Sequence, residues 1–295
     1  MTVPEAVAPL AGGARAAGAY VDLHSHSTAS DGLVEPAAVV EAAHRAGLVA
    51  LALTDHDTVD GVAAARAAGE RLGVRIVAGA ELSAHVGSEE IHLLALHLDD
   101  VAAVAGALAR FRDDRVARAE KMVALLNARG VAVSMDDVQR EAAGGAVGRP
   151  HVARAVVAAG GARDVRDAFD RFLGNGRPAN VEKPRLDAAD AIRLVHEAGG
   201  IAVWAHPGPE ARRDRVEPLV AAGLDGLEVL HPRHGAEDEA RLGALVDFFG
   251  LVSSGGSDWH GTTDGYRVLG QMQVPLAVLE AQDARVARLR RAGAR

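Results

Sequence analysis

The feature that most constrains the fold is a repeated alternation of short apolar runs with helical patterns. Strand-length apolar runs occupy residues 20–25, 48–55, 74–82, 91–99, 201–208, 224–232 and 250–261. Helical patterns separate the first three runs, and these helices end near Gly47 and Gly73. Strand–helix–strand alternation is typical of parallel sheets, because a parallel connection needs a crossover segment. The sequence therefore predicts an α/β fold.

The strand pattern nearly disappears between about residues 100 and 199, where helical segments and a loop at 174–184 replace it. This predicts a helical insertion, residues 101–186, within one α/β body formed by residues 20–100 and 187–285. We expect residues 1–19 to be a flexible leader, because they lack the basic start of a signal peptide, and residues 286–295 to be a tail.

Charge separates the same two parts of the chain. Residues 105–185 contain 15 basic and 10 acidic side chains, a net of +5, so the remainder carries −13 within a total of −8. The acidic total argues against non-specific coating of nucleic acid. An acidic body with a basic insertion suggests that the two parts have different roles.

Composition excludes several classes of protein. The 295 residues include no cysteine, which excludes disulfides, thiolate nucleophiles and iron–sulfur clusters and fits a cytoplasmic protein. No apolar run reaches the roughly 20 residues that a membrane span requires, so we expect no membrane association. The 13 histidines, in contrast, are unusually many for a chain in which aromatic residues make up only 3%.

Histidines and carboxylates gather where the predicted strands end. Because the carboxyl ends of parallel strands meet at one face, these side chains are expected to lie close together. His92 begins its apolar run, so it needs a reversed or displaced strand to join the others. The credible donors are His24, His26, Asp31, His56, Glu81, His92, His206, Asp258 and His260.

These donors are too many for one ion, since a single zinc needs three or four ligands. They suit two or three ions, with a carboxylate such as Glu81 as the bridge. Imidazole and carboxylate donors without sulfur fit manganese, iron or zinc. Metal-assisted hydrolysis is the expected reaction, because clustered ions stabilise phosphoryl transfer and supply hydroxide near neutral pH.

Six short motifs follow one another between residues 20 and 261. In chain order they are HSHSTASDG, LTDHDT, GAELS, the isolated His92, AHPG and GSDWHG. In this order they resemble the signature blocks of the polymerase-and-histidinol-phosphatase (PHP) superfamily. The resemblance implies a distorted (β/α)7 barrel with a trinuclear metal site. It is greatest to the branch that removes the 3′-phosphate from 3′,5′-bisphosphonucleotides, some members of which trim RNA 5′ ends.

The resemblance also implies roles for single residues. One ion would be held by His24, His26, Glu81 and Asp258, a second by Glu81, His92 and His206, and a third by Asp31, His56 and His260. A hydroxide bridging two ions would attack phosphorus. The insertion would grip the substrate phosphates through Arg149, His151 and Lys183.

The insertion loop reads Val181-Glu182-Lys183-Pro184, where the family often has Val-Pro-Lys. Lys183 is one of only two lysines beside thirty arginines, so generic charge does not explain it. His231 and His234 follow the run at 224–232 and are candidates for an outer shell of the metal site or for a surface loop.

Four alternatives stay open at this point. An amidohydrolase would use a carboxylated barrel lysine, but Lys121 and Lys183 both fall in the insertion. A histidinol-phosphate phosphatase or a 5′–3′ exonuclease would use the same metal site, although the basic insertion favours a doubly phosphorylated substrate or a nucleic-acid end. A non-catalytic metal-binding module would not need all nine donors. The oligomeric state is left open.

Overall fold

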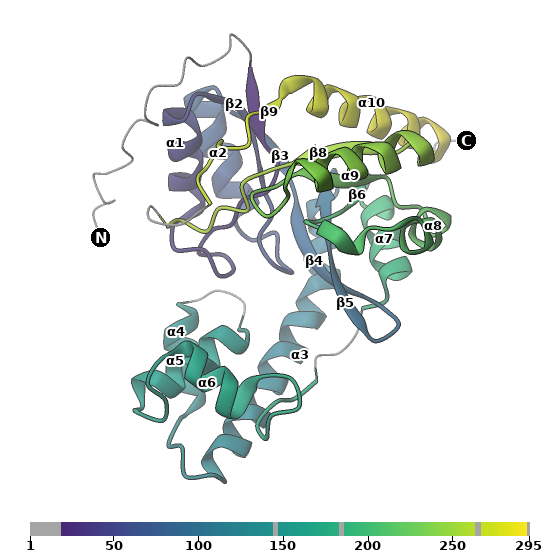
Figure 1. The fold of residues 1–295 in the computed structure, drawn as a ribbon. Coiled ribbons are helices and arrows are strands. Elements are labelled where there is room, and N and C mark those ends of the chain that lie inside the picture. Colours follow the sequence, from purple (N-terminus) through teal and green to yellow (C-terminus); the bar gives the residue numbers. More distant parts are fainter. Residues whose placement is uncertain (1–18, 144–146, 183–185, 263–266, 294–295) are drawn as a thin grey trace.

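The computed structural model describes residues 19–143, 147–182, 186–262 and 267–293 (Figure 1). The predicted leader lies outside the described residues except for Ala19, and so does the end of the predicted tail, residues 294–295. Two sheets form the body, and a group of helices extends from it on the long helix α3, Val101–Asn127.

The first sheet has four strands in the order β3-β2-β1-β9. Strands β1, β2 and β3 are parallel, as the alternation predicted, and β9 pairs with β1 in the antiparallel direction. Helices α1 and α2 are the crossovers, and α1 begins with a proline at a position where its missing N–H costs nothing. The bounds are β1 Tyr20–Asp22, α1 Pro36–Arg45, β2 Leu48–Leu53, α2 Val62–Leu72, β3 Arg75–Ala78 and β9 Val274–Pro275.

The second sheet has five strands in the order β4-β5-β6-β7-β8. Strand β5 runs antiparallel to both β4 and β6, while β6, β7 and β8 are parallel. The direction of β5 is the reversal that His92 needed in order to reach the other donors. The bounds are β4 Ala80–Val86, β5 Glu89–Leu96, β6 Ile201–Trp204, β7 Gly226–Leu230 and β8 Val252–Gly255.

The apolar run at 74–82 is two strands rather than one, so the prediction that Glu81 ends a third strand is wrong. The chain leaves the first sheet after Ala78 and enters the second at Ala80. A side chain on Gly79 would lie 2.8 Å from the carbonyl oxygen of Ala95, so only glycine fits this close crossing. Glu81 consequently lies near the start of β4.

Backbone contacts join the two sheets beside the strand ends. Leu23 N donates to Gly255 O at 3.0 Å, and Asp258 N donates to His24 O at 2.9 Å. On the other side, an isolated parallel bridge links His56 and Glu81. Among the described residues these links do not form a continuous ladder, so the structure has two linked sheets and not one closed sheet.

The insertion has a hydrophobic core of its own. Helix α3 contributes Val104 and Leu108 to the body core, whereas Met122 and Leu126 belong to a separate cluster formed by residues 119–179. The α3 helix therefore connects the two cores, as Figure 1 shows. The remaining elements of the insertion are α4 Met135–Ala142, α5 Arg149–Ala158, α6 Val165–Ala168 and the π-helical turn η1 Phe169–Leu173.

The other helices cover the second sheet and the end of the body away from the insertion (Figure 1). Within the described part of the chain, no helix is both long and apolar enough to cross a membrane. The helices of the body that follow the insertion are α7 Ala188–Glu197, the 3-10 turn η2 Gly208–Glu210, α8 Arg213–Ala221, α9 Ala236–Phe249 and α10 Leu276–Gly293.

Candidate metal centre and adjoining cavity

The carboxylate of Glu81 is surrounded by imidazole rings at the edge where the two sheets meet. Its side chain is 1% exposed. Three rings approach Oε2 at 3.2–3.3 Å, those of His24, His26 and His56. Two more approach Oε1 at 2.7 and 2.9 Å, those of His92 and His206. A carboxylate with several nitrogen donors on each oxygen has the arrangement of a bridge between cations.

Two aspartates complete the cluster beside His24, His26 and His260. Asp258 Oδ1 lies 3.2 Å from His26 Nε2 and 3.5 Å from His24 Nε2. Asp31 Oδ1 lies 3.4 Å from His260 Nε2. The structure thus brings all nine predicted donors into one continuous cluster.

Three groups of donor atoms within this cluster are close enough for each to share an ion. All atoms of a group lie within 4.8 Å of one another. The groups are His24, His26, Glu81 and Asp258; His56, Glu81 and His92; and His26, Asp31, His56 and His260. The first group equals a predicted set, and the last adds His26 to one. In the middle group His56 stands where His206 was expected.

The donor set fits divalent cations on two further grounds. Ligand atoms about 2.1 Å from one ion lie no more than about 4.2 Å apart, which is close to the observed spacing. His26 Nδ1 is buried without a hydrogen-bond partner among the described residues, and the nearest carboxylate oxygen, of Asp31, is 4.0 Å away. A buried ring nitrogen without a partner is costly, and a cation would satisfy it.

Opposite charges determine the protonation of the cluster. Burial by itself lowers the pKa of His26, but Asp258 and Glu81 raise it to about 9. Burial would raise the pKa of Glu81, yet the neighbouring histidines His56, His24 and His92 hold it well below its usual range. For His56 burial dominates and lowers the pKa to about 3. The carboxylates are therefore ionised at neutral pH, as metal ligands must be.

Glu228 is a buried partner of this cluster that the sequence analysis missed. On strand β7 its Oε1 lies 3.0 Å from His24 Nδ1, and its Oε2 accepts a hydrogen bond from His206 N at 2.6 Å. His206 has a φ of 34°, in the left-handed region that is unfavourable for a residue with a side chain. Glu228 thus holds two donors in place. Glu228 shares the apolar run LDGLEVL with a second carboxylate, Asp225, so no local signal in the sequence singled it out.

The two histidines expected in an outer shell lie on the loop after β7. His231 is fully buried, and its Nε2 lies 3.4 Å from Asp258 Oδ2. His234 accepts a hydrogen bond from Gly208 N at 3.1 Å and donates to Val229 O at 2.9 Å, so it contacts the loop after His206 and none of the nine donors. Their roles stay proposals.

Arg267 is a second residue that the sequence analysis missed. Its Nη2 lies 2.8 Å from Asp258 Oδ2, and its Nη1 lies 3.2 Å from His260 Nδ1. It therefore contacts two donors from outside the cluster. One arginine among thirty gave no distinguishing signal in the sequence.

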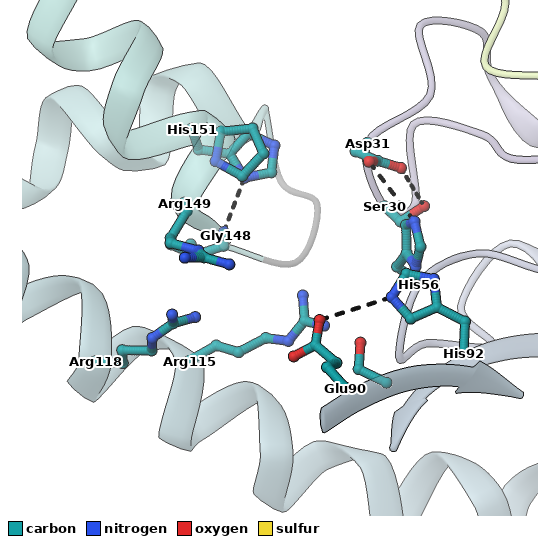
Figure 2. Close-up of a pocket in the computed structure, with 13 residues that line it drawn as sticks. Ser30, Asp31, His56, Glu90, His92, Arg115, Arg118, Gly148, Arg149 and His151 are labelled. Atoms are coloured by element: carbon teal, nitrogen blue, oxygen red, sulfur yellow. Dashed lines mark hydrogen bonds and ion pairs between the residues drawn. The ribbon is translucent and has the colours of Figure 1, made fainter. Parts of the chain in front are cut away.

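A cavity of about 170 Å³ separates the cluster from the insertion (Figure 2). Asp31, His56 and His92 lie on the body side. The insertion side carries cationic and imidazole groups, those of Arg115, Arg118, Arg149 and His151. The two walls together suit an anion that a metal centre must also contact.

The predicted substrate-binding residues can be placed in part. Arg149 and His151 both line the cavity, and Arg149 Nη1 donates to Asn175 Oδ1 at 3.1 Å. His151 Nδ1 accepts from Gly148 N at 2.9 Å, and burial lowers its pKa to about 4. Lys183 lies outside the described residues. Arg115 and Arg118 were missed, because in the sequence they resemble the solvated face of an amphipathic helix.

Comparison with known proteins agrees with this geometry. The model of the PHP domain matches residues 22–173, just over half of the chain. The 3′,5′-nucleoside bisphosphate phosphatase of Chromobacterium violaceum is 36% identical over 262 residues, which cover 86% of this chain and 92% of that protein. The 5′-3′ exoribonuclease Rnm of Escherichia coli is 34% identical over 247 residues, which cover 81% of this chain and 84% of that protein.

The fold has a counterpart among solved structures. A protein from Bifidobacterium adolescentis, described as a candidate metal-dependent phosphoesterase, has a TM-score of 0.80 and 30% identity, with coverage of 90% of this chain and 96% of that one. The family match, the relatives and this likeness in structure confirm the resemblance found in the sequence motifs. The chain belongs to the PHP-domain family and is a hydrolase that cleaves phosphoester bonds.

Proposed function

We propose that the protein removes the 3′-phosphate from a 3′,5′-bisphosphonucleotide at a centre of three divalent ions. The observation that carries this proposal is the cavity, which has metal donors on one wall and three arginines with a histidine on the other. A substrate with one phosphate to be cleaved and a second to be held matches such a cavity. The name of the Chromobacterium violaceum relative supports the same substrate.

The ions would be held by the three donor groups, with Glu81 shared between two of them and His206 completing the second. Manganese, iron and zinc all suit nitrogen and oxygen donors. Bound ions would supply hydroxide at neutral pH and offset the negative charge that develops on the phosphate. We also propose that the two linked sheets correspond to a distorted barrel, residues 20–100 and 187–285, and that residues 101–186 form the substrate-binding insertion.

The insertion would bind the phosphate that is not cleaved. Arg149 can bind it in bidentate fashion, whereas Lys183 would act as a point charge. His151 is neutral at pH 7, and because its Nδ1 accepts from Gly148, its Nε2 carries the proton. His151 is therefore a neutral hydrogen-bond donor, which adds to the two cations without a further charge to desolvate.

A panel of phosphorylated compounds tests the proposal. The purified protein, loaded in turn with manganese, zinc and ferrous iron, is offered adenosine 3′,5′-bisphosphate, the 3′- and 5′-monophosphates, histidinol phosphate and a short 5′-phosphorylated RNA. We expect phosphate release to be fastest from the 3′ position of the bisphosphate. Chelation of the metal and Glu81→Gln should each abolish release.

Two results would contradict the proposal. Faster release from histidinol phosphate would assign the cavity to a different substrate. Release of mononucleotides from the RNA, without release of inorganic phosphate from the bisphosphate, would favour an exoribonuclease like the Escherichia coli relative. Elemental analysis of the same preparation measures the number and identity of the ions.

A further inference from the structure

Arg115, on helix α3, reaches from the insertion back to the body that carries the candidate metal centre. Its Nη2 forms an ion pair with Asp57 Oδ2, and the two side chains are only 11% and 5% exposed. The same carboxylate accepts hydrogen bonds from Ser83 N at 2.8 Å and from Ser83 Oγ at 3.0 Å. Asp57 therefore ties α3 and β4 to the loop after β2.

The position of Asp57 affects two of the proposed metal ligands. It follows His56 directly, and its backbone N donates to the carbonyl oxygen of Glu81 at 2.9 Å. Its φ of 49° is in the left-handed region, which is unfavourable for a residue with a side chain. The bonds to Ser83 and Arg115 hold Asp57 in this conformation, and with it the backbone of His56.

Arg115 also faces the cavity (Figure 2). Burial lowers the pKa of its guanidinium to about 10, so the group is still charged at neutral pH. Its Nε is buried and has no hydrogen-bond partner among the described residues. The ion pair with Asp57 uses Nη2 alone among the five N–H donors of a guanidinium, so Arg115 can also donate to a phosphate oxygen in the cavity that it lines.

The other two arginines of the cavity are anchored differently. Arg118 Nε donates to Val181 O at 2.6 Å, and Arg149 Nη1 donates to Asn175 Oδ1 at 3.1 Å, so both are attached to loops of the insertion. Of the three cavity arginines, Arg115 is the one whose described hydrogen bonds and ion pairs reach the body, whereas Arg118 interacts with Glu90 of β5 only through longer-range attraction between charges. An anion bound beside it is one side chain away from the His56–Asp57 loop.

We propose that Arg115 binds the substrate phosphate that is not cleaved and, through Asp57, positions the His56 and Glu81 side of the metal centre. This inference rests on the proposed function, and it makes Arg115 a specificity determinant for a second phosphate as well as a positioning residue. With a substrate that lacks the second phosphate, the phosphate contact of Arg115 would be lost, but its positioning of the metal centre through Asp57 would remain.

The test compares adenosine 3′,5′-bisphosphate with adenosine 3′-monophosphate on the manganese-loaded full chain. Arg115→Met should lower kcat/KM about 100-fold for the bisphosphate and about tenfold for the monophosphate, since bonds to charged groups contribute roughly one to two factors of ten. Asp57→Asn should lower both by the same factor. Lys121→Met, which removes a charge from an exposed position on the same helix, should change neither.

Arg115→Lys keeps the positive charge but loses the planar, two-pronged guanidinium. Compared with Arg115→Met, we expect it to regain part of the preference for the bisphosphate, whereas the tenfold loss on the monophosphate should remain. The double variant Arg115→Met, Asp57→Asn should be no worse on the monophosphate than Arg115→Met alone. Equal losses on the two substrates in Arg115→Met would refute the phosphate contact. Additive losses in the double variant would refute the positioning role.

Two measurements keep this inference separate from the proposed function. Thermal unfolding of the metal-free variants should show coupling between Arg115 and Asp57, with a double variant less destabilised than the sum of the single changes. Titration calorimetry with the bisphosphate should show weaker binding in Arg115→Met whether or not the nucleotide is hydrolysed. If the wild-type protein cleaves neither nucleotide, the proposed function fails, and these two results decide the role of Arg115.

Discussion

Replacement of Glu228 by glutamine tests whether the cluster at the strand ends binds metal. The two carboxylate oxygens of Glu228 serve two different groups, the ring of His24 at 3.0 Å and the backbone N–H of His206 at 2.6 Å. When Nε2 of His24 faces the cluster, its Nδ1 carries a proton, so Glu228 accepts two hydrogen bonds, one from this Nδ1–H and one from the backbone N–H of His206. Glutamine has one oxygen and one NH2 group, so in either orientation one N–H meets another donor.

The expected size of the effect follows from this mismatch. Glu228 is fully buried, so water does not replace the lost acceptor. A buried donor without its acceptor costs about 1–3 kcal/mol, which corresponds to roughly five- to 150-fold in an equilibrium constant. The outer-shell partners of metal-bound histidines typically contribute 10- to 100-fold to metal affinity. We therefore expect the Kd for manganese to rise between 10- and 100-fold in Glu228→Gln.

Titration calorimetry of the metal-free protein with manganese measures this change. Glu237→Gln is the matched control, because it makes the same chemical change on an exposed side chain in the first turn of α9. Activity of Glu228→Gln should fall at limiting manganese and recover at high manganese, because the substituted residue does not contact the substrate cavity. A Kd within twofold of the wild-type value would refute the reasoning.

Three further predictions concern stability. Gly256→Ala should lower the free energy of unfolding by about 3 kcal/mol, because the new Cβ would lie 2.5 Å from the Cβ of His24. The control Gly243→Ala lies on α9 with open space around the new Cβ, so it should raise the free energy of unfolding by about 1 kcal/mol. Equal effects of the two changes in urea titrations would contradict this prediction. Asp225→Ala should lower the free energy of unfolding by about 3 kcal/mol, because this buried carboxylate accepts hydrogen bonds from His196, Ala202 and Arg285 at 2.7–3.0 Å. An unchanged Tm would show that these hydrogen bonds are dispensable. The pKa of His151 is about 4 in the folded protein, against 6.5 for an ordinary histidine, so as the pH falls the unfolded chain binds a proton before the folded protein does. The free energy of unfolding should therefore fall as the pH drops from about 6.5 to 4. His151→Gln should weaken this dependence in urea titrations at several pH values, and a pH profile identical to that of the wild type would contradict the prediction.

The sequence predicted which side chains cluster better than it predicted the path of the chain. Eight of the nine candidate donors stood out because imidazoles and carboxylates at or just after the ends of apolar runs are unusual, and His92 stood out at the start of its run. The structure collects these nine in one cluster. Glu81 was predicted to be a bridge, which stays a prediction, but its strand was misassigned, because an apolar run does not reveal a change of sheet at Gly79. The lack of room for a Cβ at that glycine comes from Ala95, on another strand.

Residues that act through distant contacts could not be recognised in the same way. Glu228 is 204 positions from His24, and Arg115 is 58 positions from Asp57. In the sequence, Arg115 is one of thirty arginines and Glu228 is one carboxylate in a strand. Neither has a local signal of its role, since the role consists of a hydrogen bond to a group brought near by folding.

The sequence by itself determined the candidate donors, the alternation of strands and helices and the basic charge of residues 105–185, because side-chain chemistry, hydrophobic periodicity and charge are local properties. The tertiary structure decided the reversal of β5 that brings His92 to Glu81, and the course of α3 that brings Arg115 to the cavity. These depend on strand pairing and on packing between segments far apart in the chain. Such contacts exist only when the two sheets and the insertion are assembled.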